Sequence, residues 1–188
     1  MNIRIRTIMK KAICILMLLS MIIVFSSCSD RIEGLENFSV HDSSVETSKY
    51  LFPCEDFIDR FEYTDGNYYY DYWSNIGYSR DKSFAYFVYT PEVYQEAMDF
   101  TLNNMSFLDE NTYEFNGYTF VQQDASVYYG EKYTPEFPDW FWMMFYSEER
   151  GVIGFFGYCS AIHLIEVRPD EDFEGFIRHE FPEYDWDA

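Results

Sequence analysis

Apolar and polar residues alternate along the stretch 65–80, which reads DGNYYYDYWSNIGYSR. Its even positions are mostly apolar and its odd positions are mostly polar. A period of two is typical of a β-strand with one covered face, so we expect Tyr68, Tyr70 and Tyr72 to face a core. A short turn at Ser79–Lys82 then leads into a second predicted strand, SFAYFVY.

The polar face of this strand also carries two aromatic residues, Tyr69 and Trp73, on either side of Asp71. Exposed tyrosine and tryptophan beside a carboxylate suit stacking on sugars or gripping a peptide. Tyr69, Asp71 and Trp73 are therefore the candidate ligand-binding residues. The simpler alternative is that tyrosine-rich domains use these side chains as bulky core residues with a polar tip near water.

A second hairpin is predicted by the dipeptide Asn116–Gly117 in TYEFNGYTFVQ. Asparagine followed by glycine is favoured in two-residue type I′ turns. Such a turn pairs Phe115 with Tyr118 and Tyr113 with Phe120, which places four aromatic side chains on one face of the hairpin.

Three stretches have a helical period instead. The first has an apolar stripe that includes Cys54, with Pro53 in its first turn. In the second, Thr90 is expected to cap the helix, and Leu102 belongs to the predicted buried stripe. The helical stretches lie near residues 53–61, 90–104 and 173–181.

The remaining apolar segments predict further strands: DWFWMMFY as a central strand, VIGFFGYC after a turn at SEERG, and AIHLIEV as one more. The resulting order is helix, two strands, helix, about five strands, helix. We therefore predict a single α+β domain. It has a mainly antiparallel sheet of about 5–7 strands, with about three helices packed on one side of it.

The first thirty residues have a different composition. Four basic residues precede a fourteen-residue run, Ala12 to Phe25, that is apolar apart from Ser20. As a helix this run would be about 21 Å long, shorter than a hydrocarbon core of about 30 Å. A secretory signal peptide over residues 1–27 fits better than a membrane-spanning helix.

The run ends in FSSC, and these residues, Phe25 to Cys28, resemble the lipobox of bacterial lipoproteins. The resemblance covers residues 1–28 only. It implies that Cys28 receives a diacylglyceryl group and becomes the N-terminus after cleavage, so that palmitate and other acyl chains anchor the protein outside the cytoplasm on the bacterial cell membrane. The alternative is ordinary cleavage, with Cys28 left as a free or disulfide-bonded thiol. The polar, serine-rich segment 28–49 is then expected to be a flexible tether, and residues 50–188 the folded domain.

Two cysteines remain in that domain, Cys54 and Cys159. Outside the cytoplasm such a pair is a candidate disulfide, and two buried free thiols are the alternative.

Charge narrows the range of partners. All 33 acidic residues but only nine of the 13 basic ones lie beyond residue 28, which gives that part a formal charge of −24. Nucleic acid is therefore excluded as a partner. High negative charge favours solubility, and recruitment of a cationic partner is the functional alternative.

Candidate chemistry is sparse. His41, His163 and His179 lie far apart in the sequence, and no metal-binding, phosphate-binding or catalytic-serine motif is present, so we predict no cofactor and no metal site. His163 lies between two apolar residues and suits a structural role. A nucleophile formed by Cys54 or Cys159 with His163 stays open, because such residues meet only in space.

The expected function is binding or interaction by a membrane-anchored lipoprotein, without catalysis. Recognition of a glycan by the aromatic and acidic residues around Asp71 is the second hypothesis. A hydrolase acting on cell-envelope polymers is the third.

Overall fold

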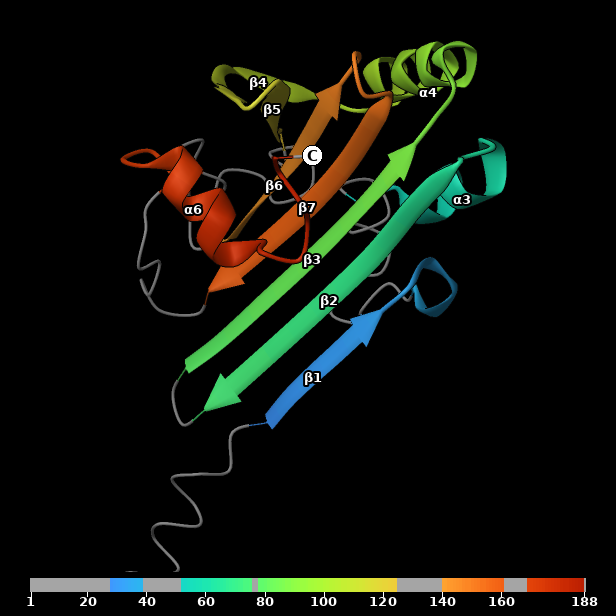
Figure 1. Ribbon diagram of the computed structural model, residues 1–188. Helices are drawn as coiled ribbons and strands as arrows, with labels where there is room; N and C mark the ends of the chain where they lie inside the picture. The colour runs from blue at the N-terminus through green and yellow to red at the C-terminus, as the bar shows by residue number, and fades with distance from the viewer. Residues whose placement is uncertain (1–27, 39–51, 76–77, 125–139, 161–168, 188) are drawn as a thin grey trace, which may run out of the picture.

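The computed structural model describes residues 28–38, 52–75, 78–124, 140–160 and 169–187. Within these ranges seven strands form one sheet in the order β1-β2-β3-β7-β6-β5-β4, and every neighbouring pair is antiparallel (Figure 1). The strands are β1 (Cys28–Glu33), β2 (Asp65–Asn75), β3 (Tyr78–Val88), β4 (Phe107–Phe115), β5 (Tyr118–Gln123), β6 (Trp140–Ser147) and β7 (Val152–Ser160). The helices are the 3₁₀ turn η1 (Leu35–Asn37), α3 (Cys54–Arg60), α4 (Pro91–Asn104) and α6 (Phe173–Glu180). The predicted α+β class with a mainly antiparallel sheet is confirmed.

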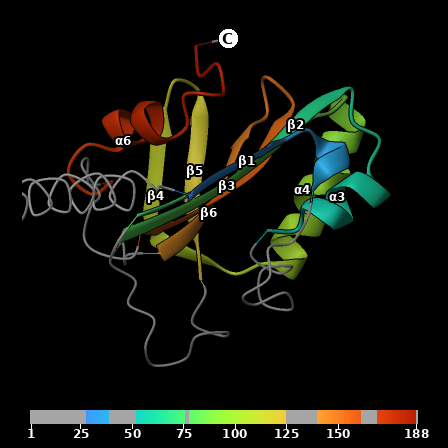
Figure 2. The same ribbon diagram turned by 90° about the horizontal axis from the view of Figure 1, so that it is seen from below.

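The sheet has a hydrophobic core on each face. Alternate residues of β2 and β3, among them Tyr68, Tyr70 and Phe87, pack against α3 and α4 on the first face. The intervening residues, such as Phe84, pack on the second face against α6 and the C-terminal segment. Figure 2 shows α6 on the opposite side of the sheet from α3 and α4. The expectation that all helices lie on one side is therefore wrong. The central strands are apolar on both faces, so both faces need cover.

The tyrosines of β2 behave as the period of two predicts. Tyr68 and Tyr70 are 1% and 5% exposed, and Tyr72 is half-buried against the same core. The structure confirms their interpretation as core-facing residues.

The Asn116–Gly117 hairpin is also confirmed. Both residues have positive φ angles, 50° and 80°, as a type I′ turn requires. The register pairs Phe115 with Tyr118 and Tyr113 with Phe120, and all four rings belong to the core on the α6 face.

The helix ends differ in how they are capped. Thr90 is the N-cap of α4, but its side chain makes no capping hydrogen bond, so the predicted cap is wrong in that respect. Leu102 is 60% exposed and does not belong to the buried stripe. At α6, by contrast, Asp172 Oδ1 accepts a hydrogen bond of 2.9 Å from the amide of Gly175.

The segment expected to be a tether is partly folded. Cys28–Glu33 forms β1, which pairs with β2 from Cys28 opposite Ser74 to Glu33 opposite Tyr69. The chain continues into η1, and the Phe38 ring lies 5.1 Å from that of Tyr68. Residues 28–38 therefore belong to the folded domain, which was expected to start near residue 50. Residues 39–51, and the predicted strand at 161–167, lie outside the described ranges.

The turn between β2 and β3 lies earlier than predicted. β2 ends at Asn75 and β3 begins at Tyr78, so Ser79–Lys82 is part of a strand and not a turn. The shift places Lys82 opposite Asp71 and Arg80 opposite Trp73. This register brings Arg80 and Lys82 beside the candidate ligand-binding residues of β2.

Candidate functional site

The three candidate ligand-binding residues lie on one face of β2. Tyr69, Asp71 and Trp73 occupy alternate positions, and all three are half-buried. Tyr69 lies on the α6 face, since its ring contacts that of Phe84 at 6.1 Å. The structure thus brings the predicted residues together in one row along the strand.

Neighbouring strands add three basic residues to this row. Arg31 on β1 and Lys82 on β3 both lie opposite Asp71, one on each side. Arg80 on β3 lies opposite Trp73. We call this set the β2 patch; it consists of Arg31, Tyr69, Asp71, Trp73, Arg80 and Lys82.

Asp71 is the acidic centre of the patch. Its Oδ2 lies 3.2 Å from Arg80 Nη2 and 4.0 Å from Lys82 Nζ. The Asp71 side chain keeps 26% of its surface exposed and Lys82 only 9%. Because the Asp71 carboxylate faces two cations, these contacts fix the orientation of its side chain on the sheet.

The C-terminal end of α6 completes the network. Arg80 Nη1 lies 3.3 Å from Glu180 Oε2, and Glu180 is 2% exposed. The Lys82 ammonium donates a hydrogen bond to the main-chain carbonyl of Glu180 and lies 3.4 Å from Glu183 Oε1. His179 Nδ1 is 3.1 Å from the other carboxylate oxygen of Glu180. These contacts hold α6 against the sheet, so Arg80 and Lys82 have a structural role.

The two aromatic residues differ in their surroundings. Tyr69 Oη accepts a hydrogen bond of 2.8 Å from Asn67 Nδ2, and burial together with the nearby Glu33 carboxylate raises the pKa of Tyr69. Trp73 lies four residues further along β2, which is about 13 Å at about 3.3 Å per residue. The pair therefore offers two separate contact points rather than one continuous stacking surface.

The patch is shallow. A cavity of about 10 Å³ lies between residues that include Arg31, Tyr69, Lys82 and Glu183. That is room for a single water molecule. A ligand of this patch would lie on the surface and would not enter a pocket.

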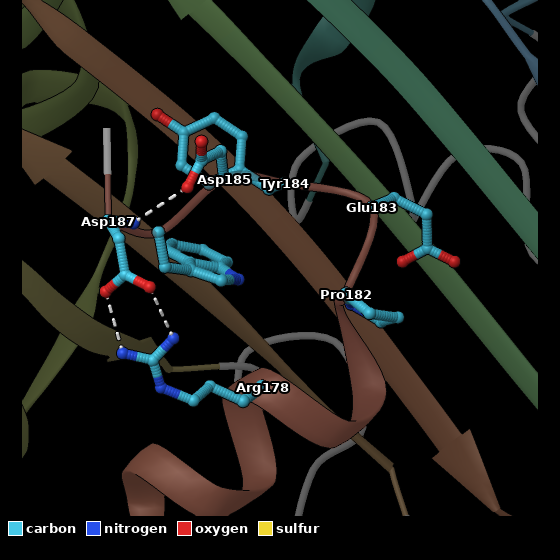
Figure 3. Close-up of a pocket in the computed structure, with 7 residues that line it drawn as sticks. Arg178, Pro182, Glu183, Tyr184, Asp185 and Asp187 are labelled. Carbon is cyan, nitrogen blue, oxygen red and sulfur yellow. Dashed lines mark hydrogen bonds and ion pairs between the residues drawn. The ribbon is translucent and has the colours of Figure 1, made fainter.

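A larger hollow lies beside it on the same face, in the C-terminal segment (Figure 3). Its volume is about 390 Å³, and it is lined by Arg178, Pro182, Glu183, Tyr184, Asp185, Trp186 and Asp187. Arg178 closes one side, with Nη1 and Nη2 at 3.0 and 2.8 Å from the two carboxylate oxygens of Asp187. Figure 3 shows the Glu183 side chain on the other side of the hollow. Glu183 lines both the hollow and the small cavity, so the two are adjacent.

The ionic groups of the hollow are mostly used within the protein. Arg178 also holds Glu174 at 3.0 Å, and Asp185 Oδ1 accepts a hydrogen bond from the Asp187 amide. The guanidinium of Arg178 lowers the pKa of Asp187. The one basic group that lines the hollow, the Arg178 guanidinium, is thus occupied by carboxylates of the protein itself.

The structure does not support Cys54 as a nucleophile or as a disulfide partner of Cys159. Cys54 is a free thiol with no exposed surface, and burial, with a smaller effect of Glu55, raises the pKa of Cys54. A buried thiol with a raised pKa supplies little thiolate. Cys159 is exposed near the end of β7, opposite Asp81, whereas Cys54 packs in the core with Tyr68 and Phe155. The predicted disulfide is therefore wrong, and so is the alternative of two buried thiols.

The other candidate chemistry is not assembled in the part of the chain that the structure describes. His163 and His41 lie outside it, and His179 contacts Glu180. The described residues contain no group of three or more histidine, cysteine or acidic side chains able to hold a metal ion. Among the helices of these same ranges, none is long and apolar enough to cross a membrane.

The sequence did not predict Arg80, Lys82, Glu180 and Glu183 as members of the site. The sequence pattern predicts a turn at Ser79–Lys82, and residues in a turn would not lie opposite Trp73 and Asp71 on the neighbouring strand. All residues from Ser79 to Ser83 are polar, so no period of two in the sequence extends the second strand back through Arg80 and Lys82.

Comparison of the chain with protein-family models, with curated proteins and with solved structures finds no match.

Proposed function

We propose that this protein is an extracytoplasmic lipoprotein of the bacterial cell membrane, anchored through acylated Cys28. In this proposal its acidic α+β domain acts by binding and not by catalysis. The observation that carries the proposal is the sequence FSSC at 25–28, directly after a short apolar run with a basic start.

The position of β1 supports this assignment. β1 begins at Cys28, the residue that the lipobox resemblance makes the mature N-terminus. Cleavage before Cys28 would leave every described strand intact.

The β2 patch is the surface proposed to bind. It combines two half-buried aromatic rings with ionic groups, and the small cavity between its own residues admits only about one water molecule. These features suit a ligand that lies across the strands, such as a polypeptide segment of a partner. A glycan is the second candidate, because Tyr69 and Trp73 lie on one face with Asp71 between them.

The anchor is tested by metabolic labelling with palmitate in a bacterial host. The wild-type chain is expected to take up label and to sediment with membranes, whereas Cys28→Ala is expected to do neither. Wild-type protein that is released without label would overturn the proposal.

The ligand class is tested by affinity electrophoresis of the purified domain through gels that contain soluble starch, xylan or peptidoglycan fragments. If a glycan is bound, the wild-type protein should migrate more slowly in the gel that contains it, and Trp73→Ala should migrate as it does in a gel without glycan. Trp142→Ala, a half-buried tryptophan on β6, is the matched control. Unretarded wild-type protein in every gel would count against the glycan and leave the partner segment as the ligand class.

A further inference from the structure

The first residue of the sheet is also the proposed point of attachment to the membrane. Cys28 lies opposite Ser74, near the end of β2, and the rest of β1 runs away from it along the sheet edge. No chain separates Cys28 from β1. An acyl group on Cys28 would therefore hold this end of the sheet at the bilayer, without the flexible spacer that the sequence suggested.

The two ends of the sheet differ in what they carry. Figure 1 shows α3 and α4 gathered at the end away from the start of β1. β2 has eleven residues, so the two ends are about 33 Å apart along the strand.

The charged residues are distributed unevenly between these ends. The halves of β1, β2 and β3 nearer to Cys28 carry three basic residues, Arg31, Arg80 and Lys82, and three acidic ones, Asp30, Asp71 and Asp81, so their formal charges cancel. Glu180 and Glu183 contact Arg80 and Lys82, which leaves Arg31 as an exposed cation on β1. At the other end, α3 and α4 together carry six carboxylates and one basic residue, Arg60.

Aromatic residues lie at the Cys28 end too. Tyr72 and Trp73 are half-buried and sit within two positions of Ser74, the partner of Cys28. Tyrosine and tryptophan are favoured where an apolar interior meets a polar headgroup layer. A basic side chain near an anionic bilayer surface is favourable, whereas clustered carboxylates are repelled.

We infer that the end of the sheet formed by the start of β1, the end of β2 and the start of β3 is a membrane-contacting surface. It rests on the lipid headgroups of the bilayer that holds the anchor, and α3 and α4 point away from that bilayer. This inference rests on the proposed lipid anchor.

The orientation is measured by energy transfer from a fluorophore on the protein to an acceptor dye in the bilayer. The lipidated protein is reconstituted in vesicles of phosphatidylcholine with a minority of phosphatidylglycerol. One label is attached at Glu33→Cys on β1 and the other at Gln95→Cys on α4. Both changes are at exposed positions and are made in a Cys159→Ser background.

The label at 33 is expected to lie closer to the bilayer than the label at 95, by about 13 Å or more. Glu33 pairs with Tyr69, which lies four residues, or about 13 Å, from Asp65 at the start of β2. The helix α4 lies at that end of the strand (Figure 1). Equal transfer from the two sites, or greater transfer from site 95, would overturn the inference. A protein without acyl groups on Cys28 would overturn the anchor itself, and mass spectrometry of the same sample distinguishes that failure.

Two variants test the cause of the orientation. A flexible insert of about 20 glycine and serine residues after Cys28, spanning about 25 Å, is expected to reduce transfer at site 33. Unchanged transfer would overturn the direct attachment. Arg31→Glu should reduce transfer at site 33 on vesicles with phosphatidylglycerol, whereas the matched Arg60→Glu on α3 should not. If Arg31→Glu and Arg60→Glu changed the transfer at site 33 equally, the inference that Arg31 lies next to the anionic headgroups would be wrong.

Discussion

The ammonium group of Lys82 on β3 donates a hydrogen bond to the main-chain carbonyl of Glu180, which lies 98 positions later in the chain at the end of α6. The Lys82 side chain is buried, and its Nζ also lies 5.7 Å from the centre of the Phe181 ring. One buried cation therefore joins the sheet to the last helix. The same cation lies next to Asp71, so stability and the β2 patch depend on a common group.

Replacement of this cation should destabilise the fold. Lys82→Met keeps the aliphatic chain but leaves the Glu180 carbonyl and the Glu183 carboxylate without their donor. We expect a loss of about 1–3 kcal/mol in the free energy of unfolding, measured by urea denaturation. Arg60→Met, which removes an exposed ion pair to Asp56 and a contact with the Phe100 ring, should cost less than about 1 kcal/mol. A Lys82→Met protein as stable as wild type would show that the network is not needed to hold α6.

Buried tyrosines should make the fold sensitive to alkali. Burial raises the pKa of Tyr68 and Tyr89 strongly, and that of Tyr94 to about 12. In the unfolded chain these hydroxyls ionise near pH 10. Above that pH the unfolded state has lost protons that the folded state keeps, so stability falls as pH rises. Each such tyrosine contributes a slope of up to about 1.4 kcal/mol per pH unit.

The measurement is urea unfolding at intervals between neutral pH and about pH 11, the range that spans the ordinary tyrosine pKa of about 10. Tyr89→Phe should weaken the alkaline loss, because its buried hydroxyl makes no hydrogen bond and its removal leaves no partner unpaired. Stability that stays constant through pH 11 would contradict the burial of these side chains.

Removal of the N-cap side chain should destabilise the protein more at α6 than at α4. Asp172→Ala removes the side-chain hydrogen bond to the Gly175 amide and should cost about 1 kcal/mol. Thr90→Ala removes no such bond and should cost clearly less. Thermal unfolding of the two variants decides the comparison, and a reversed order would be inconsistent with the helix ends described above.

The state of Cys54 can be read from its reaction with an alkylating reagent. Without any reductant, Cys54 should be protected in the native protein and should react once the protein is unfolded in urea, because it is buried but free. If Cys54 formed a disulfide, alkylation would require reduction as well. Peptide mass spectrometry of the alkylated protein separates the two cases.

The sequence predicted most clearly those elements that local chemistry determines. The Asn116–Gly117 turn needs two positive φ angles that few other dipeptides adopt, so it determined both the hairpin and its register. The period of two in β2 likewise predicted which tyrosines are buried.

The parts that were missed depend on long-range pairing. Cys28–Glu33 has no strong strand pattern of its own, and it becomes a strand because β2 offers an open edge for it. The turn between β2 and β3 was placed too late because Arg80 and Lys82 look like turn residues when they are considered alone. Their pairing with Trp73 and Asp71, and their contacts with α6, are visible only in the folded chain.

The most direct test of the proposed anchor is mass spectrometry of the N-terminal peptide of protein extracted from bacterial membranes. We predict that the mature chain starts at Cys28 and that this residue carries acyl groups. A membrane-extracted or soluble chain that retains residues 1–27, with Cys28 unmodified, would contradict the proposed function.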